Sequence, residues 1–206
     1  MSTLEQAFRR AVEDLTALKC RWALVGGLAV SARSEPRFTR DIDFAVVVER
    51  DEDAESLASL LRGRGYTPLA LVEQDSMRRL ATLRLAAPGA GKQGVVVDLL
   101  FASSGIEGEV VAAAEPLEVF QGLTVPVAQL GHLLALKVLS RDDQRRPQDL
   151  VDLRALLTVA TENDLAMARS SLSLITVRGF ARGRNLEKAL GELLPGVSPS
   201  PGSNEG

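Results

Sequence analysis

The sequence predicts a mixed α/β fold followed by a helical region, with the change near residue 127. In the first part, short apolar segments of strand length alternate with segments of helical periodicity, which is the pattern of a mixed α/β unit. In the second part, apolar residues recur at helical spacing in every segment. Turns that contain glycine or proline separate the segments of the first part.

The elements of the first part follow from apolar spacing and from the turn residues between them. Apolar residues recur at helical spacing over residues 4–19, and the amphipathic segment 53–62 stops at Gly63 and Gly65. Apolar runs of strand length lie between such breaks. In chain order we expect helix 4–19, strand 22–25, helix 28–32, strand 41–48, helix 53–62, strands 66–72, 78–86 and 94–102, and a hairpin over 118–127.

The second part reads as a series of helices followed by a tail. Leu130, Leu133 and Leu134 form the apolar stripe of the first helix. The last residues are rich in Pro, Ser and Gly, a composition typical of disorder. The expected helices are 129–140, 148–160, 162–171 and 185–194. We therefore expect a core over 1–127, a helical region over 128–194 and a disordered tail over 195–206.

The composition indicates an ordinary globular protein. The 206 residues are 46 % hydrophobic and 25 % charged, and the net charge of −3 lacks the basic signature of a protein that coats nucleic acid. A single cysteine, Cys20, excludes a disulfide within the chain and fits a reducing compartment. Neither a signal peptide nor the roughly 20 apolar residues of a membrane span are present, so we expect a cytoplasmic protein without a membrane partner.

Two aspartates separated by one residue, Asp41 and Asp43, are the most informative pair in the chain. On the expected strand 41–48, alternate side chains share a face, so both carboxylates lie opposite Ile42 and Phe44. Like charges this close resist ionisation, and a divalent cation removes the repulsion. Magnesium binds through one or two carboxylates together with substrate phosphates. The pair therefore predicts a metal site that handles phosphates.

Two further features point to the same chemistry. Gly26-Gly27 falls where a strand turns into a helix, so a phosphate could approach the backbone N–H groups; a tight turn without a ligand is the alternative. Asp98 lies in the apolar run 94–101, where a carboxylate is costly unless it is paired or bound to metal. An aspartate bonded to a loop is the alternative there, but next to the other two acids a metal ligand or base is favoured.

Charged residues also interrupt the apolar faces of two later helices. Lys137 lies in the apolar stripe of its helix and needs an anionic partner, a phosphate or a carboxylate, unless it extends to solvent. Asp149 shares the inward face of the next helix with Leu153, although Pro147 also marks a helix start, where an acid is favoured. Asp152, at the edge of that face, is a weaker candidate.

Arg37 and Arg40 are candidate phosphate ligands because guanidinium groups match phosphate oxygens. Residues 89–93, Gly-Ala-Gly-Lys-Gln, lack the spacing and the following Ser or Thr of a phosphate loop, and we expect a hairpin turn there. His132, the only histidine, is expected on the polar side of its helix without a catalytic role.

Together these residues resemble the nucleotidyltransferase fold of the DNA-polymerase-β superfamily. Its pattern is a glycine turn, two acids separated by one residue and a third acid on a later strand, here Gly26-Gly27, Asp41 with Asp43, and Asp98. The segment Arg-Phe-Thr-Arg-Asp-Ile-Asp-Phe at 37–44 further resembles the AbiEii-like branch, which includes toxins of toxin–antitoxin and phage-defence systems. That branch also has a helix lysine and an Asp-Leu-x-Asp-Leu helix, which match Lys137 and residues 149–153.

The resemblance, over residues 20–160, implies an enzyme with a nucleotidyltransferase-type mixed sheet flanked by helices. It implies that Asp41, Asp43 and Asp98 hold Mg²⁺ or Mn²⁺ and that Asp98 accepts a proton from the acceptor hydroxyl. Lys137, oriented by Asp149, would bind phosphate oxygens. The glycine turn, Arg37 and Arg40 would line the nucleotide site.

The implied substrates are an NTP and an RNA acceptor, most simply a tRNA end, and the implied partner is a cognate antitoxin. Two alternatives stay open. One is a transferase that modifies a protein or a small molecule such as an aminoglycoside. The other is a catalytically silent antitoxin or regulatory module.

Overall fold

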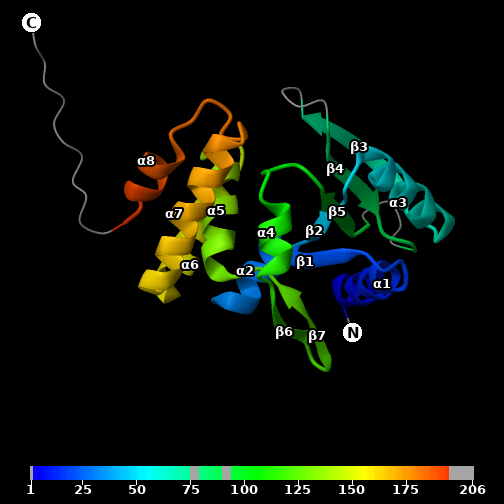
Figure 1. Cartoon of the computed structure of the whole chain (residues 1–206). Helices are drawn as coiled ribbons and strands as arrows, with labels where there is room; N and C mark the ends of the chain where they lie inside the picture. Colours follow the sequence, from blue (N-terminus) through cyan, green and yellow to red (C-terminus); the bar gives the residue numbers. More distant parts are fainter. Residues whose placement is uncertain (1, 75–78, 90–93, 195–206) are drawn as a thin grey trace, which may run out of the picture.

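The computed structural model describes residues 2–74, 79–89 and 94–194, and these form one seven-stranded mixed sheet with helices around it (Figure 1). The order across the sheet is β3-β4-β5-β2-β1-β7-β6. The strands are β1 (Arg21–Val25), β2 (Asp41–Val47), β3 (Thr67–Gln74), β4 (Arg79–Ala86), β5 (Val96–Leu100), β6 (Glu115–Phe120) and β7 (Leu123–Val127). The predicted α/β class is confirmed.

The two strands that carry the predicted carboxylates lie side by side within the sheet. β2 pairs with β5 in parallel and with β1 antiparallel, while β5 pairs antiparallel with β4. Parallel neighbours need a crossover connection, and here α3 (Asp51–Gly63) and the antiparallel pair of β3 and β4 supply it. The crossover brings Asp98 beside Asp43, although the two are far apart in the sequence.

The helices of the second part pack together beside the sheet, away from the first and third helices (Figure 1). Buried residues of both parts, among them Phe8, Phe44, Leu133 and Leu172, belong to one hydrophobic cluster. The division proposed at residue 127 stays a prediction, but the regions on its two sides share this core. The remaining helices are α1 (Thr3–Ala17), α2 (Gly26–Arg33), α4 (Glu107–Ala112), α5 (Leu130–Ser140), α6 (Pro147–Val159), α7 (Glu162–Val177) and α8 (Leu186–Gly191).

The expected elements are found within a few residues of their predicted bounds, with two exceptions. Helix α4 was not expected, because six residues are too few to display a helical period; the Glu107 carboxylate secures its start by accepting the N–H groups of Ser103 and Ser104, each at 2.8 Å. Helix α7 runs on to Val177 instead of ending at 171, since Leu172 and Ile175 continue its buried stripe. The predicted tail and most of the 89–93 turn lie outside the described residues.

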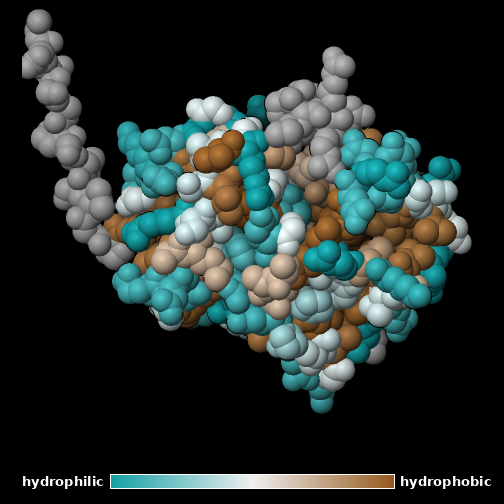
Figure 2. All heavy atoms as spheres, in the orientation of Figure 1, coloured by the Kyte–Doolittle hydropathy of each residue, from teal (hydrophilic) through white to brown (hydrophobic). Residues whose placement is uncertain are grey.

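The surface mixes hydrophilic and hydrophobic residues over the face that Figure 2 shows. Exposed aliphatic side chains, including Leu69 and Leu71, occur on β3, which is an edge strand of the sheet. Among the described residues, no helix is long and apolar enough to cross a membrane.

Candidate active site

Three aspartates, Asp41, Asp43 and Asp98, share one face of the sheet; we call them the carboxylate trio. In the parallel register of β2 and β5, Asp43 lies beside Asp98. Residues in register on adjacent strands project to the same face, and so do alternate residues of one strand. The trio therefore points one way, as the sequence predicts, while Ile42 and Phe44 are fully buried on the opposite side.

The glycine turn leaves space for the carboxyl group of Asp43. Gly26 has φ +65°, and a Cβ there would overlap the carboxyl group of Asp43. The backbone N–H of the next residue, Gly27, lowers the pKa of the same carboxyl group. A Cβ on Gly27 would lie 2.7 Å from the guanidinium of Arg37 and 2.8 Å from the hydroxyl of Thr39. Side chains at either position would thus displace the groups that build the site.

Proximity and burial make the carboxylate trio hard to ionise. Burial raises the pKa of Asp43 to about 7, and the charges of Asp98 and Asp41 act in the same direction against Lys137 and the Gly27 N–H. Burial also raises the pKa of Asp98, with Asp41 adding to the effect and Arg84 opposing it. A cation bound among these groups would favour their charged forms.

The oxygen ligands of the carboxylate trio are of the kind that binds a hard divalent cation, although the three carboxylates are not close enough together to form a complete metal site. Across the described ranges, no three carboxylate, imidazole or thiol groups lie close enough together to hold a metal ion. The Oδ1 atom of Asp98, however, is buried without a hydrogen-bond partner. An unsatisfied carboxylate oxygen beside two further carboxylates is the ligand chemistry that Mg²⁺ or Mn²⁺ accepts.

Lys137 has the anionic partners that the sequence requires of it. Its Nζ lies 2.7 Å from Oδ1 of Asp149 and 2.8 Å from Oδ2 of Asp152. The hydroxyl of Ser140 donates to the other oxygen of Asp149 at 3.0 Å. The ammonium group also lowers the pKa of Asp43, which places it within electrostatic reach of the carboxylate trio.

Asp152, expected at the edge of its helix face, is in fact the better-buried acid of α6. It is completely buried and accepts from Arg37 Nη2 at 2.7 Å as well as from Lys137. Burial opposes its ionisation, but the hydrogen bonds from Arg37 and Lys137 outweigh that cost and lower its pKa. A helical wheel underrates Asp152 because its partner Arg37 comes from a distant loop. Arg40, in contrast, is exposed and stacks on the ring of Phe38.

A cavity of about 980 Å³ is lined by residues of the sheet and of the second part of the chain. Of the predicted site residues it gathers five, namely Gly26, Asp43, Asp98, Lys137 and Asp149, while Asp41, Gly27, Arg37 and Arg40 do not line it. This volume is in the range of small-molecule sites.

Arginines that the sequence analysis did not single out also line this cavity. Arg84 stands on β4, and Arg146 and Arg182 stand on loops of the second part. Burial lowers the pKa of Arg182, and the nearby charges of Arg146 and Arg184 add to the effect, so these cations are crowded together. In the sequence, Arg84 could have been noticed as an arginine between Leu83 and Leu85 in an apolar strand. Its position beside the acids could not, because that position depends on the register between strands.

His132 does not lie on a polar side of α5, so that prediction was wrong. It is buried, as are most residues of this helix, because α5 is packed against α2, α6, α7 and α8. Its Nδ1 has no hydrogen-bond partner, and burial lowers its pKa against the opposing charge of Glu109.

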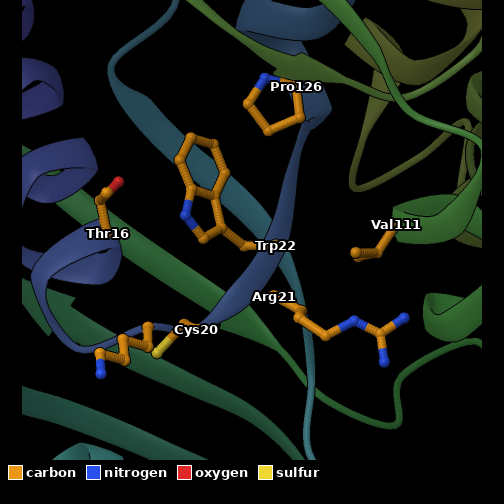
Figure 3. A pocket seen from close by; sticks show the side chains of 7 residues that line it. Thr16, Cys20, Arg21, Trp22, Val111 and Pro126 are labelled. Carbon is orange, nitrogen blue, oxygen red and sulfur yellow. The ribbon is translucent and has the colours of Figure 1, made fainter.

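A second cavity, of about 420 Å³, lies at the other end of β1 (Figure 3). Figure 3 shows Arg21 and Trp22 on that strand, with Val111 and Pro126 facing them from other segments. Its lining contains no carboxylate and none of the predicted site residues. The chemistry suggested by the sequence is therefore concentrated in the larger cavity.

Comparison with known proteins gives one family. The family model described as "Nucleotidyl transferase AbiEii toxin, Type IV TA system" matches residues 10–195. A search of the curated proteins returns no match.

Solved structures with a similar fold are nucleotidyltransferases and a nucleotidyltransferase-like protein. An antigenic nucleotidyltransferase-like protein from Paracoccidioides brasiliensis is 20% identical, with 92% of each chain covered and a TM-score of 0.53. The antibiotic-resistance factor ANT(2'')-Ia is 15% identical over 86% of this chain and 96% of its own, with a TM-score of 0.55. The lincosamide adenylyltransferase LnuA is 14% identical over 76% of this chain and 98% of its own, with a TM-score of 0.51. At these identities the likeness shows the fold alone.

Proposed function

The chain belongs to the AbiEii nucleotidyltransferase toxin family, and on this premise we propose that it is a Mg²⁺-dependent enzyme that moves a nucleoside monophosphate from an NTP to a hydroxyl of RNA, such as a tRNA end. Nucleotidyl transfer requires an NTP, and a type IV toxin–antitoxin system implies an antitoxin. The observation that carries the proposal is the pairing of Asp43 with Asp98 above the Gly26 turn, at the floor of the large cavity.

In this proposal the carboxylate trio holds the metal and prepares the acceptor. Asp41 and Asp43 would be the ligands, and Asp98 would complete the set. A divalent ion held there would neutralise charge on the attacked phosphate and on the leaving pyrophosphate. Asp98 would accept the proton of the incoming hydroxyl.

The helical part supplies the remaining groups. Lys137 binds phosphate oxygens, and its two aspartate partners on α6 hold its Nζ in place. The two aspartates fix the lysine side chain before the phosphate binds. The side chain therefore loses little conformational freedom when the phosphate arrives.

The crowded arginines favour an anionic acceptor. Arg146, Arg182 and Arg184 all line the cavity, and after burial the charges of Arg146 and Arg184 lower the pKa of Arg182 further. RNA brings phosphates that relieve this repulsion, whereas a cationic aminoglycoside would add to it. RNA is therefore favoured over an aminoglycoside as the acceptor.

The test is transfer of labelled nucleotide. Each of the four NTPs, labelled on the α-phosphate, is incubated with total tRNA, with a protein mixture and with an aminoglycoside. We expect label on tRNA with the wild-type protein and none with Asp41→Ala. Label on the aminoglycoside or on protein instead would overturn the RNA acceptor. A protein that neither transfers label nor binds nucleotide would be a silent module.

A further inference from the structure

Arg84 lies among the acids that the proposed function assigns to the metal. On β4 it is the register partner of Asp98 on β5, which in turn neighbours Asp43 on β2. A single line of side chains thus runs across three strands on one face of the sheet. The Nη2 of Arg84 lies 3.3 Å from Oδ2 of Asp41, and its Nε lies 3.6 Å from Oδ1 of Asp98.

These distances are long for ion pairs, so the guanidinium of Arg84 is only weakly bound to the two carboxylates. Charge-assisted N–H···O bonds are normally about 2.7–2.9 Å long, and Asp98 Oδ1 remains without a hydrogen bond despite the nearby guanidinium. The Arg37–Asp152 pair, at 2.7 Å with a fully buried carboxylate, shows what a fixed pair looks like in the same protein. The side chain of Arg84 is 40 % exposed and lines the large cavity, so it has space to move.

Arg84 is also the counter-ion of two acids of the carboxylate trio. Its guanidinium bridges two of the three acids and supplies the positive charge that a divalent ion would otherwise bring. An ion that took these two oxygens, Oδ2 of Asp41 and Oδ1 of Asp98, as ligands would therefore displace it. A triphosphate in the cavity offers the displaced guanidinium a stronger, bidentate partner.

We propose that Arg84 couples metal binding to nucleotide binding: it competes with the divalent ion for Asp41 and Asp98 until a triphosphate draws it away. The inference rests on the proposed function and adds a residue and a sequence of binding to it. Coupling of this kind is reciprocal, because the metal equally favours the phosphate-bound position of Arg84.

The coupling gives one substitution two opposite effects. Without Arg84 the carboxylates lose a competing charge, so the nucleotide-free protein should bind metal more tightly. The triphosphate loses a cationic partner, so metal-free nucleotide binding should weaken. A residue that merely stabilised the fold would weaken both when removed.

The experiment measures Mn²⁺ binding by the electron paramagnetic resonance of the free ion. Binding of a non-hydrolysable NTP analogue is measured separately in EDTA. Since a unit charge a few ångström away acts strongly on partly buried carboxylates, we expect Arg84→Met to bind Mn²⁺ about tenfold more tightly. The analogue should bind at least several-fold more weakly.

Arg84→Gln provides a second variant of closer polarity, and Arg84→Lys should stay near wild type for Mn²⁺. Arg21→Met removes the same charge at the far end of β1 and should change neither affinity. Intact wild-type Mn²⁺ binding together with unchanged or weaker binding in Arg84→Met and Arg84→Gln would overturn the coupling alone. Absence of Mn²⁺ binding to the wild type, even with the analogue present, would overturn the metal mechanism and the coupling with it.

Discussion

Gly26 shows how one residue type sets the geometry of the site. Its φ of +65° is one that side-chain-bearing residues rarely adopt, and the space beside it is filled by the carboxyl group of Asp43. The glycine therefore meets two demands, a backbone conformation and a close approach. These demands can be separated, because Gly122 has a similar φ of +72° with nothing within 4 Å of a Cβ.

Gly26→Ala should abolish nucleotidyl transfer, because the new methyl group displaces Asp43. Gly122→Ala should cost a similar backbone strain, about 1–2 kcal/mol in the free energy of unfolding, and keep transfer. Urea unfolding and label transfer on both variants test this. Transfer by Gly26→Ala at the level of Gly122→Ala would contradict the assigned role of the turn.

The raised pKa of Asp43 gives a pH dependence of stability. Its folded pKa of about 7 exceeds the ordinary value of 3.8, so the folded state binds the proton more tightly than the unfolded state. Without divalent ions, the free energy of unfolding should therefore fall as pH rises from about 4 to 7, by about 2–4 kcal/mol.

Asp43→Asn should lack this fall, and Mg²⁺ should flatten it in the wild type by stabilising the charged form. Unfolding curves at several pH values, with EDTA or Mg²⁺, measure both effects. A wild type as pH-independent as the variant in EDTA would contradict the assigned environment of Asp43.

At the scale of elements, one buried acid of helix α6 connects this helix to the loop before β2 and to α5. Asp152 accepts from Arg37, in the loop before β2, and from Lys137 on α5. Three segments therefore meet at a single carboxylate, which is also one of the two that hold the lysine of the site.

Asp152→Ala should destabilise the fold by about 3–5 kcal/mol, because the guanidinium of Arg37 loses its carboxylate partner and Lys137 loses one of its two. Asp143→Ala removes an exposed acid paired with Arg141 just before α6 and should leave stability unchanged. Thermal and urea unfolding compare them. Equal stability of the two variants would show that Asp152 is not the point of attachment.

The elements and part of the site could be predicted from the sequence. The acids on β2 and β5 were recognised because alternation fixes which face each side chain takes, and a lysine in an apolar stripe is visible without coordinates. The partnership of Arg37 with Asp152 and the position of Arg84 were not visible, since each depends on how distant segments meet. His132 was misplaced because a helix covered on several sides has no solvent-facing stripe to detect.

At the scale of the whole molecule, the large cavity draws on both parts of the chain, and its acids and cations define what the enzyme would do in a cell. Asp41 has a side chain that is 45 % exposed, so its removal should spare the fold while removing a metal ligand. This makes it suitable for a test of toxicity in living cells.

Expression of the wild-type chain should arrest bacterial growth, and Asp41→Ala should relieve the arrest at equal protein level. Glu49→Ala, an exposed acid just beyond the other end of β2, is the matched control and should remain toxic. Colony counts and immunoblots measure the outcome. Arrest by Asp41→Ala as strong as that by the wild type would separate toxicity from nucleotidyl transfer.

The order in which the chain is made has a consequence for the proposed toxin activity. The parallel pairing of Leu24 with Val127 closes the sheet only when more than half of the polypeptide has left the ribosome, and the lysine and its aspartate partners emerge later still. Long-range pairing of this kind forms slowly. For the proposed toxin, the nascent chain would consequently be inactive for most of its synthesis, which would give an antitoxin made at the same time the chance to be present before the first active molecule appears.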